Sequence, residues 1–148
     1  MYKKILVPLD GSLLNESIVP QVTELALAYS AELVLLRVAQ AHVFPGTDPT
    51  EAQVEAVRRA EKYLEKVSRD VRREGLRVST AVRYGDAAEE ILDHAALADV
   101  DLIAMSARGR TGLARMVMGS VTGEVMRKAA CPVLTVRPAE ASPVAAAA

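Results

Sequence analysis

The sequence predicts a single-domain α/β protein whose five-stranded parallel sheet carries helices on both faces. Three observations lead to this prediction. Short apolar runs alternate with longer segments of helical periodicity five times along the chain, and strand–helix alternation is typical of parallel sheets joined by right-handed crossovers. The length of 148 residues fits one domain with its own core. Hydrophobic residues make up 51% of the chain and charged residues 25%, as in ordinary globular proteins.

The first strand is expected at Ile5–Leu9, an apolar run that ends in the turn sequence Asp10-Gly11-Ser12. Ser12 suits the N-cap position of the helix that follows. Pro20 lies inside the helical pattern and predicts either a kink or a late helix start. The apolar positions of this helix are Val22, Leu25, Ala26 and Tyr29.

The second strand is expected at Leu33–Val38, where the sequence LVLLRV reads as a buried strand. After a long linker over residues 39–46, the sequence Asp48-Pro49-Thr50-Glu51 predicts a helix start with Asp as N-cap, Pro at N1 and Glu at N3. This helix is expected to end before Gly75, with a charged face in solvent. Its apolar stripe is Val57, Ala60, Leu64, Val67 and Val71.

The third strand is expected at Leu76–Tyr84, near a sheet edge. Gly85-Asp86 then begins a helix with Asp86 as N-cap and Glu89 at N3. Apolar residues at helical spacing face inward from this helix, and they are Ile91, Leu92 and Ala95.

The last elements are a fourth strand at Leu102–Met105, a helix at Gly119–Ala129 and a fifth strand at Pro132–Val136. Cys131 precedes the fifth strand, and we expect it to be a buried, inert thiol. Residues 138–148 form a Pro/Ala-rich tail without periodicity, which predicts disorder.

The composition argues against several classes of protein. The net charge is −1 and the pI about 6.1, so no overall basicity points to nucleic acid, and aromatics are only 3% of the chain. No apolar run approaches the ~20 residues of a membrane span, and the single cysteine allows no intrachain disulfide. We therefore expect a soluble, cytoplasmic protein without a nucleic-acid or membrane partner.

The most informative segment is Asp101–Val121, DLIAMSARGRTGLARMVMGSV. An apolar strand ends there, a loop rich in glycine and arginine follows, and Gly119-Ser120 then opens a helix. Small residues let backbone N–H groups approach a phosphate, and a helix N-terminus favours negative charge. If strands one and four are neighbours, this loop faces the Asp10-Gly11-Ser12 turn across one crevice, where such sheets bind ligands.

Competing motifs are absent from the sequence. It contains no Gly-x4-Gly-Lys-Ser/Thr phosphate loop, and no Gly-x-Gly-x-x-Gly follows the first strand. His42 and His94 have no Cys or His partner at metal-ligand spacing, so each is expected to be a surface or packing residue.

The spacing of glycines in this segment carries a family resemblance. Nine residues separate Gly109 from Gly119, and Ser120 follows at once. Here the chain resembles the universal stress protein family, whose nucleotide-binding branch carries Gly-x2-Gly-x9-Gly-Ser/Thr. Ser106 replaces the first glycine of that motif, and Gly112 does not fit its spacing. Serine retains a backbone N–H but lacks the conformational freedom of glycine.

The resemblance extends over almost the whole chain. It includes MYKKILVPLDGS at the start, ELVLLRV in the second strand, YGDAAEEIL before the third helix and CPVLTVRP at the end. It implies a universal stress protein domain over residues 1–137, with a Rossmann-like fold of the adenine-nucleotide alpha-hydrolase type.

The resemblance also implies a nucleotide site. Asp10 would lie beside the nucleoside, and the main chain at Val38 would meet the adenine. The phosphates would lie on backbone groups around Ser106 and the N-terminus of the helix at Gly119. The implied site residues are Pro8, Leu9, Asp10, Val38, Met105, Ser106, Arg108, Gly109, Arg110, Gly119, Ser120 and Val121.

The residues alone leave alternatives open at several of these positions. Asp10 also suits a turn residue that bonds its own backbone. Gly119 and Ser120 also suit a plain helix start. Arg108 and Arg110 either add charge to a phosphate site or point into solvent.

The function that the resemblance implies is a regulatory stress-response protein that binds ATP, ADP or AMP. Mg²⁺ or Mn²⁺ would travel with the phosphates rather than bind the protein directly, and slow ATP hydrolysis is compatible with a protein that is not a dedicated enzyme. The resemblance further implies a homodimer through the edge strand Pro132–Val136. The alternative is a nucleotide-free dimeric interaction module, which Ser106 favours and Gly109, Gly119 and Ser120 oppose.

Overall fold

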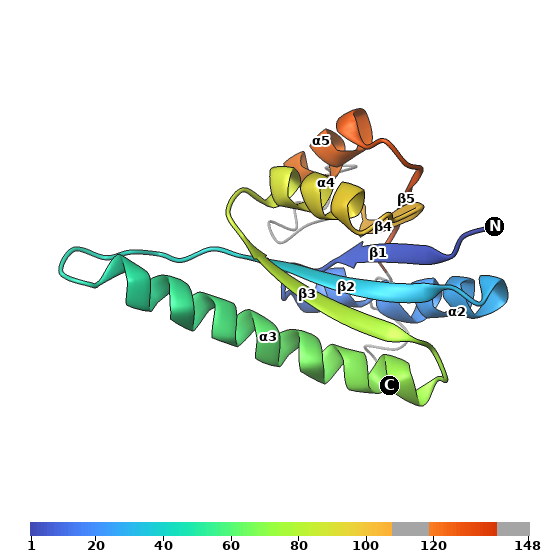
Figure 1. Cartoon of the computed structure of the whole chain (residues 1–148), viewed down its shortest axis with the longest axis horizontal. Coiled ribbons are helices and arrows are strands. Elements are labelled where there is room, and N and C mark those ends of the chain that lie inside the picture. Colours follow the sequence, from blue (N-terminus) through green and yellow to red (C-terminus); the bar gives the residue numbers. More distant parts are fainter. Residues whose placement is uncertain (108–118, 139–148) are drawn as a thin grey trace, which may run out of the picture.

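A computed structural model describes residues 1–107 and 119–138 of the chain. Within these residues one five-stranded parallel sheet has the order β3-β2-β1-β4-β5 (Figure 1). The strands are β1 (Lys4–Pro8), β2 (Glu32–Ala39), β3 (Val78–Tyr84), β4 (Leu102–Ser106) and β5 (Val133–Val136). The helices are α1 (Leu13–Glu16), α2 (Val19–Tyr29), α3 (Pro49–Arg73), α4 (Ala87–Leu97) and α5 (Ser120–Lys128). The predicted fold class is therefore confirmed.

Helices cover both faces of the sheet, with α2 and α3 on one side and α4 and α5 on the other (Figure 1). Side chains alternate between the two faces along β1 because successive residues of a strand point in opposite directions. Ile5 and Val7 belong to the core under α2 and α3, which also contains Leu64. Leu6 belongs to the opposite core, which contains Ile91 of α4 and Val125 of α5.

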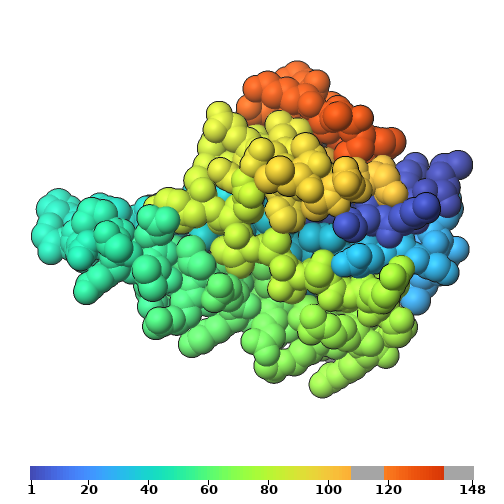
Figure 2. All heavy atoms as spheres, viewed as in Figure 1, coloured from blue at the N-terminus to red at the C-terminus, as the bar shows by residue number. Residues whose placement is uncertain are grey.

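Helix α3 begins as the sequence predicts, because the Asp48 side chain accepts a hydrogen bond of 2.8 Å from the Thr50 N–H. Its buried face is Ala56, Ala60, Leu64, Val67, Ser68 and Val71. Val57 is half-buried and packs against the cluster of Ala39, Ala56 and Ala60, so the predicted stripe is confirmed, with Ala56 as a buried position that it did not include. The N-terminal turns of α3 project beyond the sheet together with the segment that precedes them (Figures 1 and 2).

The helical region after β1 is two helices. The Asn15 N–H donates to Ser12 Oγ at 3.1 Å, which confirms Ser12 as an N-cap, although α1 ends at Glu16. Helix α2 starts at Val19 with Pro20 in its first turn, where the missing N–H costs nothing, so the late start is the outcome. Tyr29 is 41% exposed and packs edge-on against Tyr2, so it does not face the core as the apolar pattern predicted.

Other differences from the sequence-based expectations are small. Strand β3 begins at Val78 rather than Leu76, and β1 ends at Pro8, with Leu9 continuing one hydrogen bond to Leu36. Cys131 is half-buried rather than buried, and desolvation raises the pKa of its thiol. Of the predicted tail over residues 138–148, all but the first residue lies outside the described part of the chain. In the described residues, no helix combines the length and apolar character needed to cross a membrane.

Candidate functional site

The strand order places a candidate site between β1 and β4. Strand β1 pairs with β2 on one side and with β4 on the other. The strands β2 and β3 therefore follow each other toward one edge of the sheet, and β4 and β5 toward the other edge, so the strand order reverses between β1 and β4. Ligands of open parallel sheets bind at such a reversal, beyond the carboxyl ends of the strands. A cavity of about 300 Å³, referred to below as the cleft, lies at this place. Its wall includes Pro8, Leu9, Asp10, Asn15, Leu36, Arg37, Val38, Gln40, His42, Ala87, Ile91, Met105, Ser106, Gly119, Ser120, Val121 and Thr122.

Most of the site residues predicted from the sequence meet in this cleft. Those that line it are Pro8, Leu9, Asp10, Val38, Met105, Ser106, Gly119, Ser120 and Val121. Arg108, Gly109 and Arg110 lie outside the described residues. The structure therefore brings the turn after β1 together with the end of β4 and the start of α5, and the sequence analysis expected such a meeting if β1 and β4 are neighbours.

The inner wall of the cleft is apolar and buried. Leu36 and Val38 of β2 and Met105 of β4 are buried in the same core as Ile91 of α4. The Leu9 N–H donates to the Leu36 carbonyl oxygen at 2.8 Å, which extends the pairing of β1 and β2 up to the cleft. Such a wall favours a flat, apolar ring.

Asp10 both holds a turn and faces the cleft. Its Oδ1 accepts hydrogen bonds from the Ser12 N–H at 2.9 Å and from Ser12 Oγ at 2.6 Å, and its N–H donates to Asn15 Oδ1 at 2.9 Å. Gly11 has a φ of +86°, which favours glycine in the middle of this turn. The turn-residue interpretation of Asp10 is therefore confirmed. It is compatible with a ligand contact, because the half-buried carboxylate also lines the cleft.

The N-terminus of α5 presents backbone N–H groups to the cleft. Gly119 is the N-cap, with φ −69° and ψ 163°, and no side chain caps the helix there. Its carbonyl oxygen accepts the Gly123 N–H at 3.0 Å, which leaves the N–H groups of Ser120 and Val121 without acceptors inside the helix. These donors and the helix dipole together attract an anion.

Ser106 ends β4 and is 2% exposed. Positive φ angles outside glycine occur in the described residues at Ser30 and Asp99, so Ser106 keeps an ordinary strand backbone. A backbone that glycine alone tolerates is therefore not required at this position. Thr122 Oγ1 donates to the Ser106 carbonyl oxygen at 3.1 Å and fixes α5 against the end of β4.

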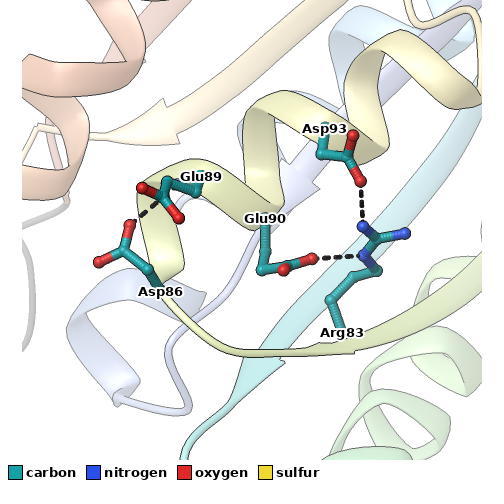
Figure 3. Close-up of polar contacts among 5 residues, drawn as sticks. All are labelled: Arg83, Asp86, Glu89, Glu90 and Asp93. Carbon is teal, nitrogen blue, oxygen red and sulfur yellow. Dashed lines mark hydrogen bonds and ion pairs between the residues drawn. The ribbon is translucent and has the colours of Figure 1, made fainter.

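Ion pairs between β3 and α4 position another part of the wall (Figure 3). Arg83 Nε contacts Glu90 Oε2 at 2.7 Å, and Arg83 also pairs with Asp93. The hydrogen bond with Glu90 is the main reason that the Arg83 pKa is raised. Asp86 accepts the Glu89 N–H at 3.1 Å, which confirms its role as N-cap. These contacts hold the helix whose first turns carry Ala87 and Ile91 to the cleft.

The sequence analysis missed several residues of the cleft wall, namely Asn15, Leu36, Arg37, Gln40, His42, Ala87, Ile91 and Thr122. Arg37 carried a signal, because it is the polar residue in the apolar run of β2. Asn15 carried none, because its side chain acts through a turn that only the folded chain forms. His42 is exposed, as a surface residue would be, and it also borders the cleft.

Comparisons with known proteins agree with this fold. The model of the universal stress protein family matches residues 1–137. Universal stress protein MJ0531 of Methanocaldococcus jannaschii is 32% identical over 142 residues, which cover 93% of this chain and 83% of the relative. Universal stress protein YxiE of Bacillus subtilis is 32% identical over 148 residues, which cover 93% of this chain and all of the relative.

Solved structures show the same fold. Universal stress protein UspA from Lactobacillus plantarum superposes with a TM-score of 0.80 at 27% identity, over 92% of this chain and 98% of that chain. A universal stress protein in complex with cAMP matches with a TM-score of 0.73 at 18% identity, over 93% of this chain and 99% of that chain. The universal stress protein from Archaeoglobus fulgidus in complex with dAMP matches with a TM-score of 0.66 at 19% identity, over 92% of this chain and 98% of that chain. With a family model that matches nearly the whole chain, this protein belongs to the universal stress protein family.

Proposed function

We propose that this protein binds an adenine nucleotide (ATP, or ADP or AMP) in the cleft. The observation that carries the proposal is the convergence of the uncapped α5 N-terminus with the Asp10 carboxylate across one apolar-walled cavity. The two ends of the site offer what the two ends of a nucleotide need. Anions bind at helix N-termini, and carboxylates accept ribose hydroxyls in related sheets. The cAMP and dAMP complexes of proteins with this fold add support.

In the proposed arrangement the adenine lies against Val38, between the apolar side chains of the inner wall. The ribose lies beside Asp10, and the phosphates accept hydrogen bonds from the backbone of Gly119, Ser120 and Val121. The Ser120 hydroxyl is exposed and suits a phosphate oxygen. Ser106 takes the place of a glycine at the end of β4, where its backbone needs no special conformation.

We further propose that a divalent cation, Mg²⁺ or Mn²⁺, accompanies the phosphates. In the described part of the chain no group of three or more His, Cys, Asp or Glu side chains could hold a metal ion. The chemistry therefore favours a cation whose ligands are phosphate oxygens and water. The phosphate end of the cleft supplies hydroxyl and N–H groups, from Ser120 and Val121.

The proposed role is regulatory rather than catalytic. Within the described residues, Asp10 supplies the carboxylate of the cleft, and that carboxylate already accepts two hydrogen bonds from Ser12. Asp10 is therefore engaged in holding the turn after β1. Slow hydrolysis of a bound triphosphate remains compatible with the role, and a cytoplasmic location stays a prediction.

We also propose that two copies of the chain pair through β5. The carbonyl oxygens of Pro132 and Val136 accept hydrogen bonds from β4, so the intervening N–H groups of Val133 and Thr135 point away from the sheet. Leu134 is 39% exposed beside them. An apolar strand edge with outward donors is a template for pairing with another strand.

Release of bound ligand and direct titration test nucleotide binding. The purified protein is denatured and its supernatant chromatographed for adenine nucleotides, and apo protein is then titrated with ATP by calorimetry. We expect an adenine nucleotide in the supernatant or saturable ATP binding. No released nucleotide together with no binding at millimolar ATP would contradict the proposal and favour a nucleotide-free interaction module.

The Gly119→Asp variant separates binding from folding. Aspartate is a good N-cap, so its carboxylate should occupy the donors of α5 and exclude phosphate. It should also stabilise the helix relative to glycine by roughly a few tenths of a kcal/mol. We expect loss of ATP binding with an unchanged circular dichroism spectrum. Gly119→Ala is the control, because it adds a methyl group without an anion and should retain measurable binding. Equal ATP affinity of wild type and Gly119→Asp would contradict the proposal that the phosphates bind at the N-terminus of α5.

A further inference from the structure

A second cavity of about 480 Å³ adjoins the cleft on the α3 side. It shares Asp10, Arg37, Gln40 and His42 with the cleft, so these residues form the boundary between the two spaces. Its other walls are the turn after β1 and the N-terminal half of α3. The remaining lining residues are Gly11, Ser12, Ala39, Ala56, Arg59, Ala60 and Tyr63.

Small side chains create the space. Ala39 of β2 packs with Ala56 and Ala60 of α3, where larger residues would close the gap between helix and sheet. At one end of the cavity the Tyr63 hydroxyl donates to Glu16 Oε2 at 3.1 Å. Burial, together with the charge of Glu16, raises the pKa of Tyr63, so this phenol stays neutral. The cavity is therefore lined here by small apolar side chains and by a neutral phenol that is bonded to the Glu16 carboxylate.

The rim of the second cavity is cationic. Arg37 lies at its boundary with the cleft, where Nη1 donates to the Val38 carbonyl oxygen at 3.4 Å. The Arg37 guanidinium packs against the turn after β1. If Gly11 carried a side chain, its Cβ would lie 3.7 Å from Arg37 Nη2. Arg59 of α3 is exposed, and among the described residues it forms no ion pair. The lining of the second cavity thus carries two guanidinium groups, those of Arg37 and Arg59, and one carboxylate, that of Asp10.

Asp10 lies at the boundary of the two cavities, and Arg37 and Arg59 line the second cavity. Carboxylates and arginines recognise different groups on a ribose. In dinucleotide-binding sheets a carboxylate beside the nucleoside accepts a free ribose hydroxyl, whereas an arginine near that position accommodates a phosphate on the ribose. Asp10 and Arg37 offer both groups at the boundary of the two cavities, so one ribose oxygen can stay free at Asp10 while the other carries a phosphate. Arginine is also the side chain that binds phosphate with paired, directional donors. A ribose beside Asp10 would hold its 2′ and 3′ oxygens at the opening of the second cavity.

We propose that the second cavity binds a phosphate carried on the ribose, so that the preferred ligand is an adenosine with phosphates on both the 5′ and the 2′ or 3′ oxygen. This inference rests on the proposed function, because it places the nucleoside in the cleft. The 5′ phosphate lies at α5, and the second phosphate lies between Arg37 and Arg59. The two positions of the second phosphate share one chemistry, and the choice between them is left to the titration.

Calorimetric titration with three ligands tests the inference. The ligands are AMP, adenosine 3′,5′-bisphosphate and adenosine 2′,5′-bisphosphate, titrated into wild type, Arg59→Glu and Arg58→Glu. Arg58 is the matched control, because it is exposed on the same turn of α3 and lines a separate groove with Val54 and Glu61. We expect one bisphosphate to bind wild type about tenfold more tightly than AMP, as one charge-assisted contact allows.

The variants decide where the second phosphate lies. Arg59→Glu should remove the advantage of the bisphosphate and leave AMP binding within about twofold of wild type, while Arg58→Glu should keep the advantage. AMP binding without any gain for either bisphosphate, or a gain that Arg59→Glu and Arg58→Glu lower equally, would overturn this inference alone. If none of the three ligands binds, and ATP does not bind either, the proposed function fails and this inference fails with it.

Discussion

Thr122 Oγ1 donates a hydrogen bond of 3.1 Å to the main-chain carbonyl oxygen of Ser106. Thr122 is 5% exposed and lies in the first turn of α5, and Ser106 is the last residue of β4. The bond therefore joins the helix end that carries the proposed phosphate donors to the strand that enters the cleft. Its strength decides how firmly these donors are held.

Thr122→Val should lower both stability and nucleotide affinity. Valine keeps the shape of threonine but removes the donor, so we expect the free energy of unfolding to fall by about 1–2 kcal/mol. Nucleotide affinity should also fall, by about three- to tenfold, because α5 loses part of its anchor. Urea unfolding and ATP titration measure the two effects.

Thr23→Val is the matched control for that variant. Thr23 is buried in α2 and donates to the Val19 carbonyl oxygen at 2.8 Å, and neither residue lines the cleft. It should show a stability change without a change in affinity. An equal loss of affinity in both variants would mean that global stability, rather than the anchor of α5, governs binding.

Thr135→Pro should convert the proposed dimer to a monomer. The Thr135 N–H points away from β4, so proline removes an outward donor and keeps the pairing within the sheet. Sedimentation velocity at about micromolar concentration distinguishes the two states, because dimers of this kind bury about 800 Å² per partner and should persist there.

Thr80→Pro provides the control on the opposite edge. The Arg77 carbonyl oxygen accepts from Leu33, so Thr80 also points its N–H outward from β3. There Arg72 Nη2 donates to the Val78 carbonyl oxygen at 3.3 Å and covers part of the edge. Dimerisation should survive this change. Loss of the dimer in Thr80→Pro but not in Thr135→Pro would contradict pairing through β5 and indicate an interface at β3.

Arg83→Gln should destabilise the fold modestly and in a salt-dependent way. The side chains of Arg83 and Glu90 are only about a quarter exposed, at 27% and 26%. We expect a loss of about 1 kcal/mol in the free energy of unfolding, which shrinks as salt screens the wild-type pairs. Arg73→Gln is the control, because Arg73 and Asp70 are 3.7 Å apart with exposures of 78% and 72%. A loss of the same size in both variants would contradict a special role for the β3–α4 pairs.

His94→Gln should reduce the loss of stability in mild acid. Burial first, and then the charge of Arg83, lower the pKa of His94 below its ordinary value of 6.5. The unfolded chain therefore takes up a proton at His94 at a higher pH than the folded chain does, so the free energy of unfolding falls as pH drops below about 6.5. Denaturant unfolding between about pH 7.5 and pH 5 measures this slope. A slope that is unchanged in His94→Gln would assign the acid sensitivity to other groups.

The helix starts illustrate what local sequence predicts well. Asp48 and Asp86 cap α3 and α4 as expected, because an N-cap needs only its own side chain and the next turn. The core stripe of α3 was less complete, since Ala56 is buried beside the half-buried Val57. Periodicity gives the apolar face to within about one position, and the packing partner selects the residue that is finally buried.

Ser106 shows the opposite case. The spacing of glycines raised the question which backbone a serine adopts there, and only the folded chain shows that it is ordinary strand. Arg37 is similar, because its guanidinium packs on a turn that is far away in sequence. The spacing of residues in the sequence does not show which side chains line the same cavity.

The sequence by itself determined the alternation of strands and helices, their caps and the small residues at Gly119-Ser120, since these depend on neighbours within one or two turns. The tertiary structure alone decided the order β3-β2-β1-β4-β5, and with it that Asp10 and the start of α5 face one cleft. It also decided that Arg37 and Arg59 border a second cavity. Strand order depends on which crossovers pack most favourably on the whole sheet, and no local pattern carries that information.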